Sequence, residues 1–155
     1  SLLLPILIKF IPTLLPSAFN ENLEKELINT FIVGTPKVGL PYPKEEGYII
    51  KVELDPWWYP TEKTKAEFRK RNIFLSDAIA PGDKNNYMGP FKITLSNYTK
   101  ERGTIYRIHG NIDPNTIGKR SSGGCIRMYN DEGLKFSNFI QKVLGNGKKV
   151  KVLYI

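Results

Sequence analysis

Short segments in which apolar and polar residues alternate run through most of this chain, and they constrain its fold more than any other feature. The clearest lie at positions 48–54, 91–95 and 104–109. A period of two places one set of side chains on one face of an extended strand. We expect these residues to face the core: Ile50, Val52 and Leu54 in the first segment, and Phe91, Ile93 and Leu95 in the second.

Three further strands are expected from their β-forming residues, at positions 6–11, 27–33 and 150–155. The sequence Gly34-Thr35-Pro36 is expected to end the second of them, because glycine and proline interrupt regular structure. The last of the three alternates as clearly as the segments above.

Two segments are expected to be helices, the first from its start signals and the second from its apolar spacing. Thr61 can cap the first of them, which reaches Arg71. Asn130 or Asp131 can cap the second, which runs to about Leu144 before a glycine-rich end.

Many strands, few helices and no regular alternation of strand with helix predict a mainly β fold. We expect a β-sandwich or a barrel-like domain with one or two short helices. A length of 155 residues fits one domain with a substantial core. Residues 1–155 are therefore expected to form a single domain.

Charge and motif content narrow the classes of partner. The net charge of +8 and the isoelectric point near 9.5 indicate an anionic partner: nucleic acid, a membrane surface or an acidic cell-wall polymer. The densest basic run, residues 63–71, is broken by Glu67 and is typical of a solvated helix face. Trp57 and Trp58 lie between prolines and are expected to pack rather than to stack on bases. The sequence has no zinc-ligand spacing and no phosphate-binding loop, so we expect neither a metal nor a nucleic-acid partner.

The apolar start of the chain lacks the features of a targeting segment. Residues 1–10 have no basic region before the apolar run, and no cleavage site of small residues follows. Pro5, Lys9 and Pro12 interrupt the run, which is too short to span a bilayer. Because the chain does not begin with methionine, we expect it to have been processed or trimmed, so that any targeting segment would have been lost.

The only cysteine and the only histidine, Cys125 and His109, are 16 residues apart. A thiolate is the attacking form of cysteine, and imidazole is the side chain best suited to take its proton near neutral pH. A lone cysteine is more often a small buried apolar residue, and a lone histidine is more often structural. If this chain performs cysteine–histidine chemistry, these two residues must carry it.

The surroundings of Cys125 favour the chemical interpretation. Gly123 and Gly124 remove side chains where backbone N–H groups would approach a substrate oxygen. Ser122 adds a hydroxyl, and Arg127 would share a face with the cysteine on an extended segment. A cysteine on a β framework also differs from the papain arrangement, in which the nucleophile begins a long helix.

Four short motifs follow one another along the chain. They are Pro56-Trp57-Trp58-Tyr59-Pro60-Thr61, then Ala80-Pro81-Gly82-Asp83 with Met88-Gly89-Pro90, then His109-Gly110, and finally Ser122-Gly123-Gly124-Cys125-Ile126-Arg127. In content and order they resemble the signature of the L,D-transpeptidase family, the YkuD or ErfK-type catalytic domain. The resemblance is strongest from about residue 31 to residue 155.

Three positions depart from the family pattern. Gly123 stands where many members have histidine, which leaves His109 as the sole available base. Some ErfK-type relatives carry other residues there, so the change does not by itself imply an inactive enzyme. Asn111 replaces the commoner threonine after His-Gly, and Tyr87 replaces the expected proline. These two changes bear on substrate fit more than on chemistry.

The resemblance implies a peptidoglycan enzyme that needs no metal or organic cofactor. Cys125 would attack the carbonyl of the third residue of a donor tetrapeptide stem, release the terminal D-alanine and form a thioester. An amine from a second stem would resolve the thioester as a 3–3 cross-link. His109 would accept and return the proton, and the Gly110 carbonyl would orient its ring.

The remaining site residues would support that chemistry. Amides around Gly124 and Cys125, next to Gly123, would stabilise the oxyanion. Ser122 would provide a hydrogen bond. Arg127 would favour the thiolate or bind a substrate carboxylate.

Two alternatives remain open. Water could resolve the thioester, which would make the protein an L,D-carboxypeptidase. The chain could also be a cell-wall-binding domain with a degenerate site, for which Gly123 is the best indication. The expected partners are peptidoglycan stem peptides and, to match the charge, anionic cell-wall polymers, with no transmembrane segment in this chain. The substrate class implies a location outside the cytoplasm, in the periplasm or the cell wall.

Overall fold

A computed structural model describes residues 8–13, 31–40, 47–99 and 104–154 of the chain. The described strands are β1 (Ile8–Thr13), β2 (Val33–Pro36), β3 (Gly47–Leu54), β4 (Phe91–Thr99), β5 (Thr104–His109), β6 (Arg120–Ser122), β7 (Ile126–Met128) and β8 (Lys149–Tyr154). The described helices are α1 (Glu62–Arg69), α2 (Asn130–Gly145) and the 3-10 turn η2 (Pro114–Thr116). The prediction of a mainly β fold with two helices is confirmed.

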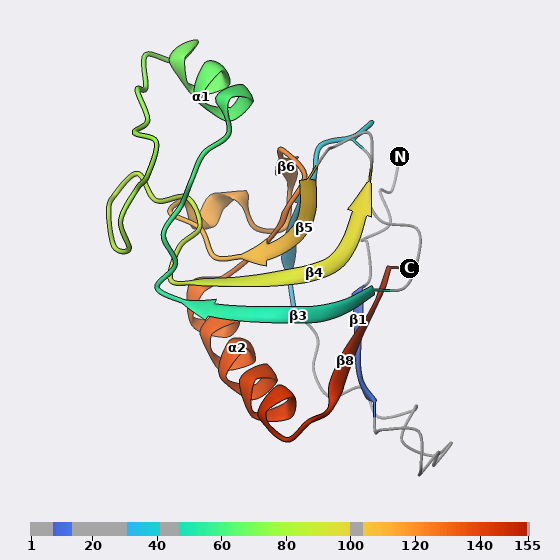
Figure 1. Ribbon diagram of the computed structural model, residues 1–155. Coiled ribbons are helices and arrows are strands. Elements are labelled where there is room, and N and C mark those ends of the chain that lie inside the picture. The colour runs from blue at the N-terminus through green and yellow to red at the C-terminus, as the bar shows by residue number, and fades with distance from the viewer. Residues whose placement is uncertain (1–7, 14–30, 41–46, 100–103, 155) are drawn as a thin grey trace.

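The described strands form one eight-stranded sheet in the order β1-β8-β3-β4-β5-β7-β2-β6. Most neighbours are antiparallel, whereas β5 pairs with β7, and β2 with β6, in parallel. The sheet is strongly curved: β3 and β4 run across Figure 1, while β8 and β1 run steeply at one end. The parallel β5–β7 pair matters most for function, because it brings the segment before residue 109 beside the segment after residue 125.

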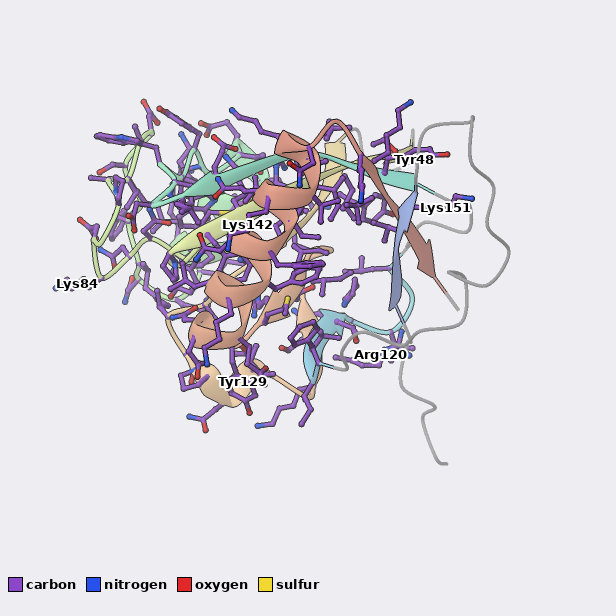
Figure 2. All side chains as sticks on the ribbon, turned by 90° about the horizontal axis from the view of Figure 1, so that it is seen from below. Tyr48, Lys84, Arg120, Tyr129, Lys142 and Lys151 are labelled. Atoms are coloured by element: carbon purple, nitrogen blue, oxygen red, sulfur yellow. The ribbon has the colours of Figure 1, made fainter. Side chains whose placement is uncertain are left out.

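The hydrophobic core lies between this sheet and α2, which packs against β3, β4 and β8. The alternation predicted for β4 is confirmed, since Phe91, Ile93 and Leu95 are fully buried. Gly133 of α2 lies against the Phe91 ring so closely that a Cβ on Gly133 would overlap it. In Figure 2 the helix runs across the sheet from Tyr129, at its start, past Lys142.

The segment between β3 and β4, residues 55–90, leaves the sheet and carries α1 (Figure 1). Thr61 caps α1 as predicted, because its side chain accepts a hydrogen bond from the Thr64 N–H at 3.2 Å. The buried Lys65 ammonium binds Asp77 at 2.5 Å and also pairs with Glu62. These contacts tie α1 to the extended chain that follows it.

Two strand predictions were wrong in part. Ile49 is 4% exposed and faces the core, whereas Ile50 is 55% and Leu54 is 41% exposed. The register with β4 shifts between Ile49 and Lys51. An extra residue at such a bulge reverses which side chains face inward. Ile50 therefore does not share a face with Val52, and Leu54 lies at the exposed end of the strand.

The second correction concerns β2. It begins at Val33 and continues through Gly34-Thr35-Pro36, the residues that were expected to end a strand. Gly34 serves close packing instead, since a Cβ there would lie 2.7 Å from the Thr116 carbonyl oxygen. The earlier part of that predicted strand, residues 27–30, lies outside the described residues, as do positions 6 and 7 of the first one.

Neither α-helix of the described ranges is long and apolar enough to cross a membrane.

Candidate active site

The predicted base is the last residue of β5, and the predicted nucleophile directly precedes β7, the parallel neighbour of β5. Ile108 of β5 pairs with Ile126 of β7, and His109 pairs with Arg127. Ile108 and Ile126 are buried in the core, so the alternation of a strand directs His109 and Arg127 to the other face. Cys125 is two residues before Arg127, the residue that pairs with His109.

A row of polar residues crosses the sheet on this face. Glu53 pairs with Lys92, Lys92 pairs with His109, and His109 pairs with Arg127 on successive strands. The Lys92 ammonium lies 2.8 Å from the Glu53 carboxylate, which also binds Lys51 at 3.2 Å. Burial opposes the ionisation of Glu53, but the hydrogen bonds and charges of Lys92 and Lys51 outweigh it and lower its pKa. His109 is therefore flanked on one side by Lys92, whose charge is balanced by Glu53, and on the other by Arg127.

His109 is buried, at 4% exposure, and its ring orientation is fixed by its own neighbour. Nδ1 lies 2.7 Å from the Gly110 carbonyl oxygen. A carbonyl oxygen can only accept, so this contact requires the proton on Nδ1. In the neutral ring, this tautomer leaves the lone pair on Nε2, which is then the atom able to accept a proton from a thiol.

Ser122 shapes the turn that carries the cysteine. Its hydroxyl donates to the Cys125 carbonyl oxygen at 2.5 Å and accepts the Gly124 N–H at 3.2 Å. Gly124 has φ 139, a conformation that side-chain-bearing residues rarely adopt. Gly123 is exposed, and a Cβ there would meet no atom within 4 Å. The half-buried thiol of Cys125 is thus presented by a turn that one serine holds together.

Arg127 is half-buried beside the cysteine. Burial lowers its pKa from the ordinary value, and interactions with Cys125, Tyr87 and Asp113 act in the opposite direction. Arginine remains protonated in proteins, so its charge favours the thiolate form of a neighbouring cysteine. In the sequence, Tyr87 was noted only as a departure from the family pattern, and Asp113 was not predicted to be a site residue.

The loop that precedes β4 packs against the residue that holds the histidine. A Cβ on Gly110 would lie 2.9 Å from Pro90 Cδ and 3.1 Å from the Met88 carbonyl oxygen. Tyr87, in the same loop, packs its ring 4.8 Å from that of Phe68 and 5.5 Å from that of Trp58, centroid to centroid. The expectation that Trp58 packs is confirmed, whereas its neighbour Trp57 is half-exposed.

Two asparagines complete the site, and sequence reasoning missed their part in it. Asn130 was expected to be a candidate helix cap, but α2 begins at Asn130 itself. Tyr129 occupies the cap position and no side chain caps the helix. The Asn130 carboxamide is hydrogen-bonded to the backbone of Asn111 instead. The only signal in the sequence was the asparagine after His-Gly, which replaces the commoner threonine.

Within the described part of the chain, no three histidine, cysteine, aspartate or glutamate side chains come together as a group able to hold a metal ion.

Comparison with known proteins assigns this arrangement to a family. The sequence profile of the L,D-transpeptidase catalytic domain, YkuD, matches residues 20–152. The chain belongs to this family. The match covers every strand from β2 to β7, both helices and all the residues discussed above, so the resemblance carried by the four motifs is confirmed.

Individual members of the family are moderately similar. The chain is 32% identical over 112 residues to the probable L,D-transpeptidase ErfK/SrfK of Escherichia coli K12, which covers 70% of this chain and 33% of that protein. It is 36% identical over 78 residues to the probable L,D-transpeptidase YcfS of the same organism, covering 50% and 23%. It is 36% identical over 64 residues to the putative L,D-transpeptidase YkuD of Bacillus licheniformis, covering 41% and 34%. The aligned part of the chain thus spans about a quarter to a third of each relative.

Proposed function

We propose that this chain is the catalytic domain of a peptidoglycan L,D-transpeptidase with Cys125 as nucleophile and His109 as base. The observation that carries the proposal is geometric. His109 ends β5, Cys125 directly precedes the parallel strand β7, and the contact between His109 Nδ1 and the Gly110 carbonyl supports a neutral ring with its lone pair on Nε2. Membership of the family supports the reaction class and the substrate class.

In the first half-reaction, the Cys125 sulfur attacks the carbonyl carbon of the third residue of a donor tetrapeptide stem. The thiol proton passes to His109 Nε2 and then to the amine of the departing D-alanine. The carbon–nitrogen bond to D-alanine breaks, and a thioester links the tripeptide stem to Cys125. Splitting one amide exchange into two acyl transfers is the usual advantage of a covalent nucleophile.

In the second half-reaction, an amine of another stem attacks the thioester carbonyl. His109 takes the proton of that amine and returns it to the departing cysteine sulfur. The new amide is a 3–3 cross-link, and the enzyme recovers its thiol. The exposed face of Gly123, where no atom lies within 4 Å of an added Cβ, leaves room for an incoming amine beside Cys125.

Arg127 and the turn at residues 122–125 support both steps. Arg127 favours the thiolate before attack or binds a stem carboxylate. An oxyanion donor contributes about 3–4 kcal/mol in other enzymes. The Gly124 N–H already donates to Ser122 Oγ, so it has to share its hydrogen between two acceptors if it also stabilises the oxyanion together with the Cys125 amide.

The proposed partners are stem peptides and anionic wall polymers, and the proposed location is outside the cytoplasm. The net charge of +8 supports an anionic polymer as a second partner. The substrate class alone supports the location, because peptidoglycan lies outside the cytoplasmic membrane.

The proposal predicts a covalent acyl-enzyme on Cys125. Purified protein is incubated with disaccharide-tetrapeptide, quenched with acid, and its intact mass is measured. The mass of the wild type should increase by that of the donor less one D-alanine, whereas Cys125→Ala should keep its mass. Circular dichroism of the two proteins should superimpose, because the substitution removes one half-buried sulfur from a surface turn.

The same samples separate the alternatives. An L,D-carboxypeptidase would form the acyl-enzyme and then yield only tripeptide monomers. A degenerate wall-binding domain would bind wall material without gaining mass, and its Cys125 would react with iodoacetamide no faster than free cysteine. An unchanged wild-type mass would therefore contradict the proposed enzyme.

A further inference from the structure

Asn130 lies at the start of α2, but its side chain bonds to the chain after β5 and not to the helix. Asparagine is among the best N-cap residues, and a cap contributes about 1 kcal/mol. Asn130 instead forms two hydrogen bonds to the backbone of Asn111. Its Oδ1 accepts the Asn111 N–H at 2.9 Å, and its Nδ2 donates to the Asn111 carbonyl oxygen at 2.9 Å. Just after the end of β5, the carboxamide thus makes the two hydrogen bonds that the backbone of a neighbouring strand would otherwise make.

The bond to Asn111 N–H acts on the histidine through one peptide group. The Gly110 carbonyl and the Asn111 N–H belong to the same planar unit and point in opposite directions. His109 Nδ1 lies 2.7 Å from the oxygen of this unit, and Asn130 Oδ1 lies 2.9 Å from its nitrogen. A rotation of the plane that weakens one of these hydrogen bonds therefore weakens the other.

Close packing reserves the space for this arrangement. A Cβ on Gly110 would lie 2.5 Å from Asn130 Oδ1, so only glycine allows the carboxamide to approach. Gly89 is equally constrained on the other side, where a Cβ would lie 2.6 Å from the Asn111 nitrogen. Asn111 Nδ2 also donates to the Met128 carbonyl oxygen at 2.7 Å, which ties the plane to the end of β7.

The electronic consequence favours one tautomer of the histidine. A peptide N–H that donates a hydrogen bond polarises its own unit, and its carbonyl becomes a stronger acceptor. A stronger and better-oriented acceptor at Gly110 holds the proton on His109 Nδ1. The Nε2 atom then keeps the lone pair that a thiol proton needs.

We infer that Asn130 is a positioning residue for His109: it fixes the Gly110–Asn111 peptide plane and, through it, the Nδ1–H tautomer. This inference rests on the proposed role of His109 as the proton acceptor. Asn130 itself does not touch the reacting atoms in this arrangement, because its two hydrogen bonds are both made to Asn111.

The tautomer can be measured directly, because the chain contains a single histidine. Protein labelled with ¹⁵N-histidine is studied by long-range ¹H–¹⁵N correlation at neutral pH. The wild type should show the Nδ1–H tautomer. Asn130→Ala should shift the population toward Nε2–H. The matched control is Asn138→Ala, which removes an exposed asparagine from the same helix and should leave the spectrum of the ring unchanged.

A conservative variant separates positioning from helix initiation. Asn130→Asp keeps an oxygen for the Asn111 N–H and loses the donor to the Asn111 carbonyl. It should retain the Nδ1–H tautomer that Asn130→Ala loses. In D-alanine release, kcat of Asn130→Ala should fall roughly tenfold to a hundredfold with KM unchanged, by analogy with the loss seen when the hydrogen-bond partners of metal-binding histidines are removed.

The outcomes distinguish this inference from the proposed function. A wild type in the Nε2–H form, or a folded Asn130→Ala that keeps both the Nδ1–H form and the wild-type kcat, would overturn the inference. If Asn130→Ala does not fold, Asn130→Asp carries the test, and a folded Asn130→Asp that loses the Nδ1–H form would overturn the inference. A wild type that releases no D-alanine would overturn the proposed function, and the tautomer shift in Asn130→Ala would still support the positioning role.

Discussion

Gly123 and Gly124 are adjacent, yet the backbone needs only one of them. Gly124 has φ 139, and holding another residue in such a conformation costs about 1–3 kcal/mol. Gly123 is exposed, and an added Cβ meets no atom within 4 Å. The fold therefore does not require glycine at position 123, where many family members have histidine. A side chain can be accommodated there.

This difference gives a prediction for two matched variants. Gly124→Ala should lower the free energy of unfolding by about 1–3 kcal/mol and slow alkylation of Cys125, because the strained turn carries the thiol. Gly123→Ala should change the unfolding free energy by less than about 0.5 kcal/mol. Urea denaturation and iodoacetamide kinetics measure both effects. Equal losses in the two variants would show that the turn does not have the described conformation.

At the residue scale, the sequence singled out the proposed reactive pair but not the residues that hold it in place. Cys125 and His109 stood out because each is the only residue of its type. The part played by Asn130 depends on a partner 19 positions away, and no local pattern reports such a contact. Its position at a helix start instead favoured the wrong interpretation, that of a cap.

Among the elements, α2 depends on a glycine inside a helix. Gly133→Ala would gain about 1 kcal/mol from helix propensity if the site were open. Because the new methyl group would overlap the buried Phe91 ring, we expect a net loss of about 1–3 kcal/mol. The matched control is Gly145→Ala at the end of the same helix, where an added Cβ meets no atom within 4 Å. Thermal denaturation should show a lower Tm for the first variant and an equal or higher Tm for the second.

The β3–β4 pair carries a pH-dependent contribution through Glu53. Its pKa is lowered in the folded protein, so the contribution is present above the unfolded value of about 4.3 and is lost as the pH falls through the folded pKa. Glu53→Gln should lower the free energy of unfolding by about 1 kcal/mol at pH 7, and its difference from wild type should shrink toward zero in acid. Urea titrations between pH 3 and pH 7 measure it, and Glu67→Gln, which breaks an exposed pair with Lys70, should give a smaller difference of the same sign. A difference that stays constant with pH would contradict the assignment.

Periodicity predicted most elements because strands and helices are local patterns. The second helix and the strand Phe91–Thr99 appeared where their spacing indicated. The inward face of β3 was wrong because the bulge near Ile50 is set by pairing with β4. The predicted end of β2 was wrong because Gly34 allows close packing against Thr116 and does not end the strand.

At the scale of the whole molecule, the site exists only because distant segments meet. The proposed base ends β5, the proposed nucleophile directly precedes β7, and the loop before β4 packs on Gly110 (Figure 1). The sheet order β1-β8-β3-β4-β5-β7-β2-β6 joins positions as far apart as Ile8 and Tyr154. Such pairing has no local signature, so the sequence predicted the mainly β class and not the order of the strands.

The central claim is that this fold uses Cys125 to exchange D-alanine for a second stem. The most direct measurement is mass spectrometry of the products formed from disaccharide-tetrapeptide muropeptides by wild type and by Cys125→Ala. We expect dimers that lack one D-alanine, formed by the wild type and absent from the variant. Dimers formed equally by the folded variant, or muropeptides left unchanged by the wild type, would contradict the account.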